Sequence, residues 1–87
     1  MQALIDYTMQ FYHSVNYGFK PTEEECRIAI KQAQIEDPSW PSEDGSIERE
    51  MLRWMIEANR RGEKMSLRAA LQETLSYGEQ DEKFAQN

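Results

Sequence analysis

The sequence predicts an all-α fold, a compact four-helix domain with helices near residues 2–16, 22–36, 46–61 and 66–77. Two patterns lead to this prediction. Apolar residues recur at spacings of three and four in each segment, which is the period of an amphipathic helix, and no segment shows the alternation of a strand. In addition, the four glycines are isolated, and each falls at an expected helix end.

The first two helices have clear start or stop signals. Apolar side chains fill about 200° of the first helix, which is wide for a helix at a protein surface. Gly18 is expected to end it, because glycine accepts the left-handed conformation of a helix C-terminus. The second helix begins at Thr22, since Thr22 and Glu25 have the spacing of a capping box. It ends before Pro38, because the residue before a proline avoids the helical region.

The second helix has apolar residues on two opposite faces. One face carries small or buried-type side chains and is assigned to the core: Cys26, Ala29, Ile30 and Ala33. Ile28 and Ile35 lie on nearly the opposite side, two turns apart, and need another partner. Together with the wide apolar face of the first helix, they predict a homodimer. Its expected interface comprises Ile28, Ile35, Phe11 and Tyr12.

A loop rich in proline and turn residues joins the second and third helices, and Trp40 is its one aromatic residue. We expect Trp40 to stay accessible and to bind a partner. The third helix ends at Gly62, and its predicted buried stripe contains Trp54. The other expected members of this stripe are Ile47, Met51, Met55 and Ala58.

The fourth helix is expected to start at a Ser66 cap and to end at Gly78. Its inward side chains are predicted to be Leu67, Leu71, Thr74 and Leu75. Residues 1–78 then form a single helical domain, and residues 79–87 form an acidic, frayed tail.

Composition limits what this domain can be. With 87 residues, 39% apolar, 30% charged and a formal charge of −6, the chain has the composition of one soluble domain. No apolar run approaches the roughly 18 residues of a membrane span, and no basic leader precedes the N-terminal apolar stretch, so we expect a cytoplasmic protein without membrane contact. A single cysteine excludes an intramolecular disulfide.

The sequence offers no constellation for catalysis, and we expect a protein that is not an enzyme. His13 is the only histidine and Cys26 the only cysteine, and Cys26 lies on a helix face where a small buried residue is expected. No glycine-rich phosphate loop and no calcium-loop spacing occur. The sequence therefore predicts no catalytic residue, no cofactor and no metal site.

Charge is distributed unevenly along the chain. Residues 46–68 carry six basic and four acidic side chains, whereas residues 1–45 carry three and eight and residues 69–87 carry one and four. On the third helix, Arg49, Arg53, Arg60 and Lys64 fall within about 60° of the wheel, opposite the apolar stripe. We call these four residues the basic ridge. It is either a solvated face paired with neighbouring glutamates or a surface that binds a partner.

Two functions remain open after these exclusions. The leading prediction is a small acidic regulatory protein that docks on a larger protein through the basic ridge and Trp40. Such a protein would be of the inhibitor or adaptor type that phages and other mobile elements encode. The alternative is a helix-turn-helix-like DNA-binding regulator that uses the basic ridge. Nucleic-acid binding is the weaker prediction, because the acidic flanks repel a polyanion.

Overall fold

The protein folds into four helices, as expected from the sequence. The computed structural model describes residues 2–15 and 18–85, with only the backbone described for residues 77–85. Within these residues the chain forms no strand, and the all-α prediction is confirmed. The helices are α1 (Gln2–Ser14), α2 (Glu23–Glu36), α3 (Ser46–Arg60) and α4 (Leu67–Ala85).

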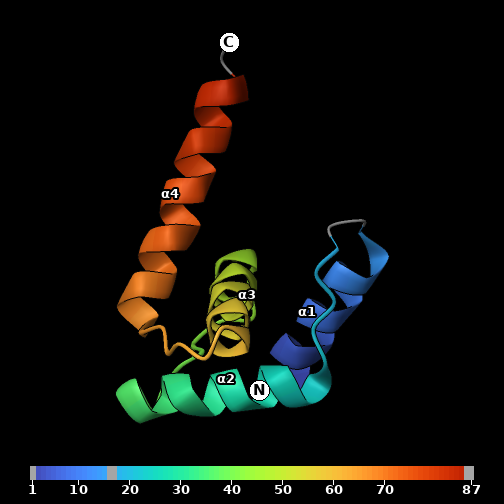
Figure 1. Cartoon of the computed structure of the whole chain (residues 1–87), viewed down its shortest axis with the longest axis vertical. Coiled ribbons are helices and arrows are strands. Elements are labelled where there is room, and N and C mark those ends of the chain that lie inside the picture. The colour runs from blue at the N-terminus through green and yellow to red at the C-terminus, as the bar shows by residue number, and fades with distance from the viewer. Residues whose placement is uncertain (1, 16–17, 86–87) are drawn as a thin grey trace.

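Helix α3 is the centre of the molecule and packs against each of the other three helices. Figure 1 shows α2 lying across one end of α3, with α1 and α4 flanking α3. The far part of α4 rises beyond the body of the domain, and the molecule is accordingly elongated, with extents of 40 × 27 × 27 Å. Because α3 has neighbours on three sides, it has little surface left for solvent.

Several helix ends form as their local sequence predicts. The Thr22 hydroxyl accepts from the Glu25 amide at 3.1 Å, and the Glu25 carboxylate accepts from the Thr22 amide at 3.0 Å, which completes the capping box. Gly18 and Gly62 have φ of +75° and +78°, the left-handed conformation expected after a helix. The Ser66 hydroxyl accepts from the Ala69 amide at 3.1 Å and so caps α4.

The end of α1 has a stabilising contact that the sequence pattern did not indicate. The Lys20 ammonium donates to the carbonyl oxygens of Tyr12, His13 and Val15 at 2.8, 3.1 and 3.0 Å. These carbonyls lie at the negative end of the helix dipole, where a cation is favoured. The segment after α1 thus folds back over the end of the helix. Asn16, the last residue of the expected first helix, lies outside the described residues.

One hydrophobic core joins all four helices and the Trp40 loop. The small-residue face of α2 is fully buried, as predicted. Helix α3 contributes Leu52, Ile56, Met51 and Met55 to the core. The remaining buried apolar members are Leu4, Ile5, Tyr12, Phe19, Trp40 and Ala70.

The two tryptophans occupy the reverse of their predicted environments. Trp40 is only 8% exposed and belongs to the core, while Trp54 is half-buried at its edge. The prediction that Trp40 stays accessible is therefore wrong. The loop that carries Trp40 folds over the core, and the Gln34 side chain donates to the Trp40 carbonyl at 3.0 Å. A turn-rich segment with one large aromatic residue thus acts as a lid on the core.

Two expectations about the ends of α3 and α4 are also wrong. Ile47 is exposed, because the buried face of α3 is rotated toward Leu52 and Ile56. Helix α4 does not stop at Gly78 but continues to Ala85. A single glycine costs an exposed helix only about 1 kcal/mol, so it need not end one. The predicted boundary at residue 78 therefore has no counterpart in the backbone.

Candidate functional site

The basic ridge is not a free surface, because its arginines bond to other residues of the same chain. The Arg49 side chain is 11% exposed and lies between α1 and α3. Its guanidinium carbon is 3.6 Å from the centre of the Phe11 ring, and Nη1 donates to the Tyr7 hydroxyl at 2.8 Å. Nη2 donates to Glu50 at 3.2 Å. A cation stacked on an aromatic face and desolvated in this way holds two helices together.

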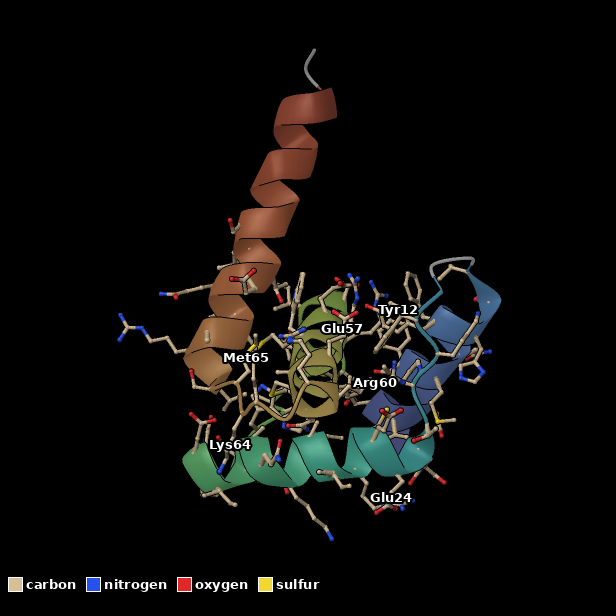
Figure 2. All side chains as sticks on the ribbon, viewed as in Figure 1. Tyr12, Glu24, Glu57, Arg60, Lys64 and Met65 are labelled. Carbon is tan, nitrogen blue, oxygen red and sulfur yellow. The ribbon has the colours of Figure 1, made fainter. Side chains whose placement is uncertain are left out.

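Arg53 and Arg60 are similarly tied to neighbouring residues. The Arg53 side chain lies between the carboxylates of Glu50 and Glu57, at 3.9 and 3.8 Å. Arg60 forms a bidentate pair with Glu25 of α2, with N–O distances of 2.6 and 2.7 Å, and also donates to the Lys20 carbonyl at 3.0 Å. Figure 2 shows Arg60 at the end of α3 that faces α2. Arg49 and Arg60 therefore connect elements of the fold, whereas these ion pairs of Arg53 lie within α3.

The pair between Arg60 and Glu25 changes the acidity of the carboxyl group. Hydrogen bonds from the Arg60 guanidinium, together with the Thr22 amide, lower the pKa of Glu25 to about 2, against a smaller opposing effect of burial. The same pair raises the pKa of Arg60. Both groups stay charged at neutral pH, and their role is to fasten α3 to the start of α2.

Tyr12, predicted at a dimer interface, is fully buried instead. Its hydroxyl donates to Glu50 at 2.6 Å, and its ring meets Phe11 and Phe19 edge-on, each at 5.0 Å between ring centres. Burial and the nearby Glu50 carboxylate raise the pKa of Tyr12 far above its ordinary value. The phenol is therefore neutral and cannot reach a second molecule. Phe11 is half-buried beneath Arg49 and is also part of this internal cluster.

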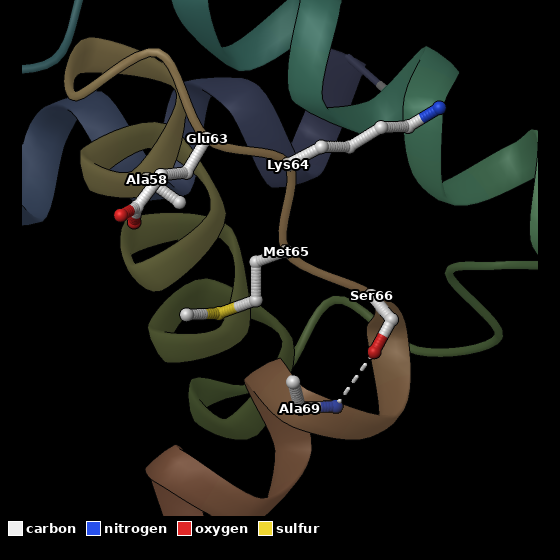
Figure 3. Close-up of a pocket in the computed structure, with 6 residues that line it drawn as sticks. All are labelled: Ala58, Glu63, Lys64, Met65, Ser66 and Ala69. Atoms are coloured by element: carbon white, nitrogen blue, oxygen red, sulfur yellow. Dashed lines mark hydrogen bonds between the residues drawn. The ribbon is translucent and has the colours of Figure 1, made fainter.

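The exposed ridge residues are Arg60, which is paired with Glu25, and Lys64. Lys64 follows a turn beside a hollow of about 400 Å³ between the end of α3 and the start of α4. The residues that line it are Ala58, Glu63, Lys64, Met65, Ser66 and Ala69. In Figure 3 the Lys64 side chain extends away from the other lining side chains, and Ser66 is occupied by its bond to Ala69. The hollow thus presents mainly apolar side chains.

Cys26 and His13, the sequence's candidates for a nucleophile and a base, lie in different environments. Cys26 is fully buried, and burial raises the pKa of its thiol to about 11, so the thiol is protonated at neutral pH. His13 lies exposed near the end of α1, with Nε2 3.0 Å from the Pro21 carbonyl oxygen. Among the described residues, no three His, Cys, Asp or Glu side chains form a group that could hold a metal ion.

In the part of the chain whose side chains are described, two helices each carry a pair of exposed large apolar side chains. The surface on α2, which we call the α2 outer face, consists of Ile28, Lys31 and Ile35. Ile28 and Ile35 are 44% and 77% exposed, as the split pattern of α2 predicted. A hollow of about 300 Å³ lies next to Lys31, lined by Gln2, Ile5, Arg27 and Lys31. The Lys31 side chain has no hydrogen bond or ion pair with another residue in the described part of the chain.

The second exposed apolar surface lies on α4 and was missed by the sequence analysis. Leu71 and Leu75 are 38% and 50% exposed, although their spacing predicted that they face the core. Ala70 belongs to the buried core instead, Leu67 packs against that core, and Thr74 is half-buried. The small size of Ala70 is the one signal in the sequence that could have indicated this, because small residues allow close approach of helices.

Comparison of this chain with protein-family models, with curated proteins and with solved structures found no match. No helix in the described ranges is both long enough and apolar enough to cross a lipid bilayer. Any assignment of function therefore depends on the surfaces described above.

Proposed function

We propose that this chain is a non-enzymatic binding protein that docks on a larger protein through the α2 outer face. The observation that supports this most directly is the exposure of Ile35 and Ile28, two turns apart on one side of a helix whose other side is fully buried. A single exposed apolar side chain is common, but an aligned pair of isoleucines on a well-packed helix is typical of a helix that binds another surface.

The charge of the α2 outer face indicates the chemistry of the partner. Lys31 lies between the two isoleucines, and Lys31 and Arg27 line the adjoining hollow. Arg27 is already paired with Glu23 and Glu24, at 3.3 and 3.0 Å, so Lys31 supplies the available cation. A partner segment with apolar side chains and a carboxylate would satisfy both features. In this proposal the protein is of the inhibitor or adaptor type, because it occupies a surface of its partner without performing chemistry.

The basic ridge no longer favours the DNA-binding alternative. Arg49, Arg53 and Arg60 are committed to contacts within the fold. In a helix-turn-helix arrangement, the start of α4 would approach DNA. The carboxylate of Glu36, the last residue of α2, lies at this point and accepts a hydrogen bond from the Leu67 amide at 3.0 Å. A carboxylate at this position repels phosphate. We therefore keep a protein partner as the proposed function.

Affinity capture from the native host with matched variants tests the proposal. Ile28 and Ile47 are equally exposed, each at 44%, but lie on α2 and α3, so Ile47→Glu is a control for Ile28→Glu. We expect one dominant protein to be retained by the wild type and by Ile47→Glu, and to be lost with Ile28→Glu and with Ile35→Glu. A photo-reactive side chain at position 35 should form a covalent adduct with the same protein.

Two results would contradict the proposal. Equal retention of the protein by all variants would show that the α2 outer face is not the docking surface. Enrichment of nucleic acid in place of protein, with a steep dependence on salt, would support the DNA-binding alternative.

A further inference from the structure

The α2 outer face and the hollow beside it share Lys31 and so form one surface. Ile28, Lys31 and Ile35 follow one another at intervals of three and four residues, which places them on one side of α2. Lys31 also lines the hollow of about 300 Å³, and the almost fully buried Ile5 of α1 forms part of its wall. Figure 1 shows α2 at one end of the domain, with the other helices on the same side of it. Both isoleucines are thus open to a partner.

Of the two cations that line the hollow, Lys31 is available to a partner. Arg27 pairs with Glu23 and Glu24 of its own helix, at 3.3 and 3.0 Å. The amide nitrogen of Gln2, another lining residue, donates to two carboxylates, each at 3.0 Å. The Lys31 side chain, by contrast, makes no hydrogen bond or ion pair within the part of the chain whose side chains are described. An anionic group that enters the hollow would therefore pair with the Lys31 ammonium.

A second copy of the chain is a poor occupant of this surface. When two such helices are antiparallel, a two-fold axis that covers both isoleucines brings Ile28 next to Ile35 of the other copy. When they are parallel, each isoleucine meets its own counterpart. Lys31 lies between the isoleucines, so in both arrangements it comes close to Lys31 of the other copy, and like charges at the centre of an interface are unfavourable. The surface therefore fits a different protein, and one that supplies an anion.

The spacing along α2 fits a helix in the partner. Seven residues of an α-helix rise about 10.5 Å, which is the separation of Ile28 and Ile35 along the helix axis. Side chains on one face of a strand recur about every 6.8 Å, so no two of them match this separation. A second helix repeats it with apolar side chains seven residues apart, and a side chain three or four residues after the first then lies level with Lys31.

We propose that the partner presents an amphipathic helix whose apolar side chains cover Ile28 and Ile35 and whose acidic side chain enters the hollow and pairs with Lys31. The isoleucines supply apolar contact area, and the ion pair fixes the position of the partner helix along α2. An uncharged side chain at this point would leave the Lys31 ammonium partly desolvated without a counter-charge. The inference rests on the proposed docking surface and adds the secondary structure and the charge of the segment that binds there.

Zero-length cross-linking with a carbodiimide tests the contact at Lys31, because the reagent joins an amine to a carboxylate only when the two groups touch. We expect the captured protein to be joined through Lys31 to an aspartate or glutamate that has apolar residues three and four positions away. Lys31→Arg removes the amine and should abolish this product, whereas Lys64→Arg, at an exposed lysine after α3, should not. A photo-adduct through position 35 without a product at Lys31 would overturn this inference and leave the docking surface intact. Absence of both adducts would overturn the docking surface as well.

Charge reversal tests whether the ion pair contributes to affinity. Lys31→Glu should weaken retention of the captured protein about tenfold, because it places like charges together. Lys64→Glu makes the same change of charge outside the surface and should leave retention unchanged. Replacing the cross-linked acidic residue of the partner by lysine should restore binding to Lys31→Glu. Equal retention by Lys31→Glu and the wild type, with loss for Ile35→Glu, would show that apolar contacts alone bind the partner and would overturn the pairing.

Two further results would overturn the proposal. A cross-linked carboxylate without apolar residues three and four positions away would contradict a helical partner segment. A wild-type dimer in light scattering that Ile35→Glu converts to a monomer would show that a second copy covers the surface.

Discussion

The contact between α1 and α3 and the outer face of α2 use side chains in opposite ways. At the α1–α3 contact, Arg49 and Glu50 are mostly covered and bond to each other and to two tyrosines. On the α2 outer face, Ile28 and Ile35 are exposed on a helix whose charged neighbours pair weakly with one another. The comparison shows that the number of neighbours around a helix, as well as side-chain polarity, decides which face meets solvent.

This difference has a physical cause. Helix α3 is surrounded, so the long stems of its arginines pack on aromatic rings while their guanidinium groups find carboxylate and hydroxyl partners. Helix α2 lies at one end of the domain and needs only one buried face, which its small residues provide. Its second apolar face has no partner within the domain. The buried charges therefore stabilise the fold, and the exposed isoleucines are available for binding.

The largest expected effect concerns Trp40, which distinguishes a lid on the core from a docking loop. Trp40→Ala should reduce the free energy of unfolding by about 3–5 kcal/mol, because it removes a large buried side chain. Trp54→Ala should cost about half as much, since Trp54 is only half-buried. Denaturant unfolding of both variants shows which substitution reduces the free energy of unfolding more. A larger loss for Trp54→Ala would show that the loop does not cover the core in solution.

The second prediction tests whether the charges between α1 and α3 are structural. Arg49→Met keeps much of the side-chain length but removes the bonds to Tyr7 and Glu50, and it should cost about 2 kcal/mol. Arg61→Met is the control, because Arg61 is exposed and pairs only locally with Glu63 at 3.1 Å. Its effect should stay within about 0.5 kcal/mol. Equal effects in denaturant unfolding would show that the Arg49 contacts add nothing to stability.

The fold was largely predictable because its signals are local. The pair of Thr22 and Glu25, the glycine at position 62 and the cap at Ser66 each act within a few residues, and each forms as expected. The exposure of Ile28 and Ile35 was also predictable, since α2 has two apolar faces and one must stay outside the core.

The environment of the basic ridge was not predictable from a helical wheel. A wheel describes one helix, whereas the partners of Arg49 and Arg60 come from residues 42 and 35 positions away in the chain. The burial of Trp40 likewise depends on how the loop folds over α2 and α3. These features are set by tertiary contacts between segments far apart in the sequence, which local periodicity does not record.

A smaller effect is expected from the ion pair between Glu25 and Arg60, and it should depend on pH. The pKa of Glu25 falls from 4.5 to about 2 in the folded chain, so the folded state binds this proton less readily than the unfolded state. The stabilisation is present above pH 4.5 and is lost as the pH falls toward 2. The thermal unfolding temperature of the wild type should fall as the pH is lowered across this range. Glu25→Gln should make the unfolding temperature depend less on pH. The same slope in both proteins would contradict the assignment.

The smallest effect on stability is expected on the α2 outer face. Ile35→Ser should change the free energy of unfolding by less than about 0.5 kcal/mol, because the side chain is 77% exposed and leaves no cavity. Denaturant unfolding should be measured over a range of protein concentrations, so that a contribution from self-association becomes visible. A loss of several kcal/mol that grows with concentration would mean that a second copy covers Ile35.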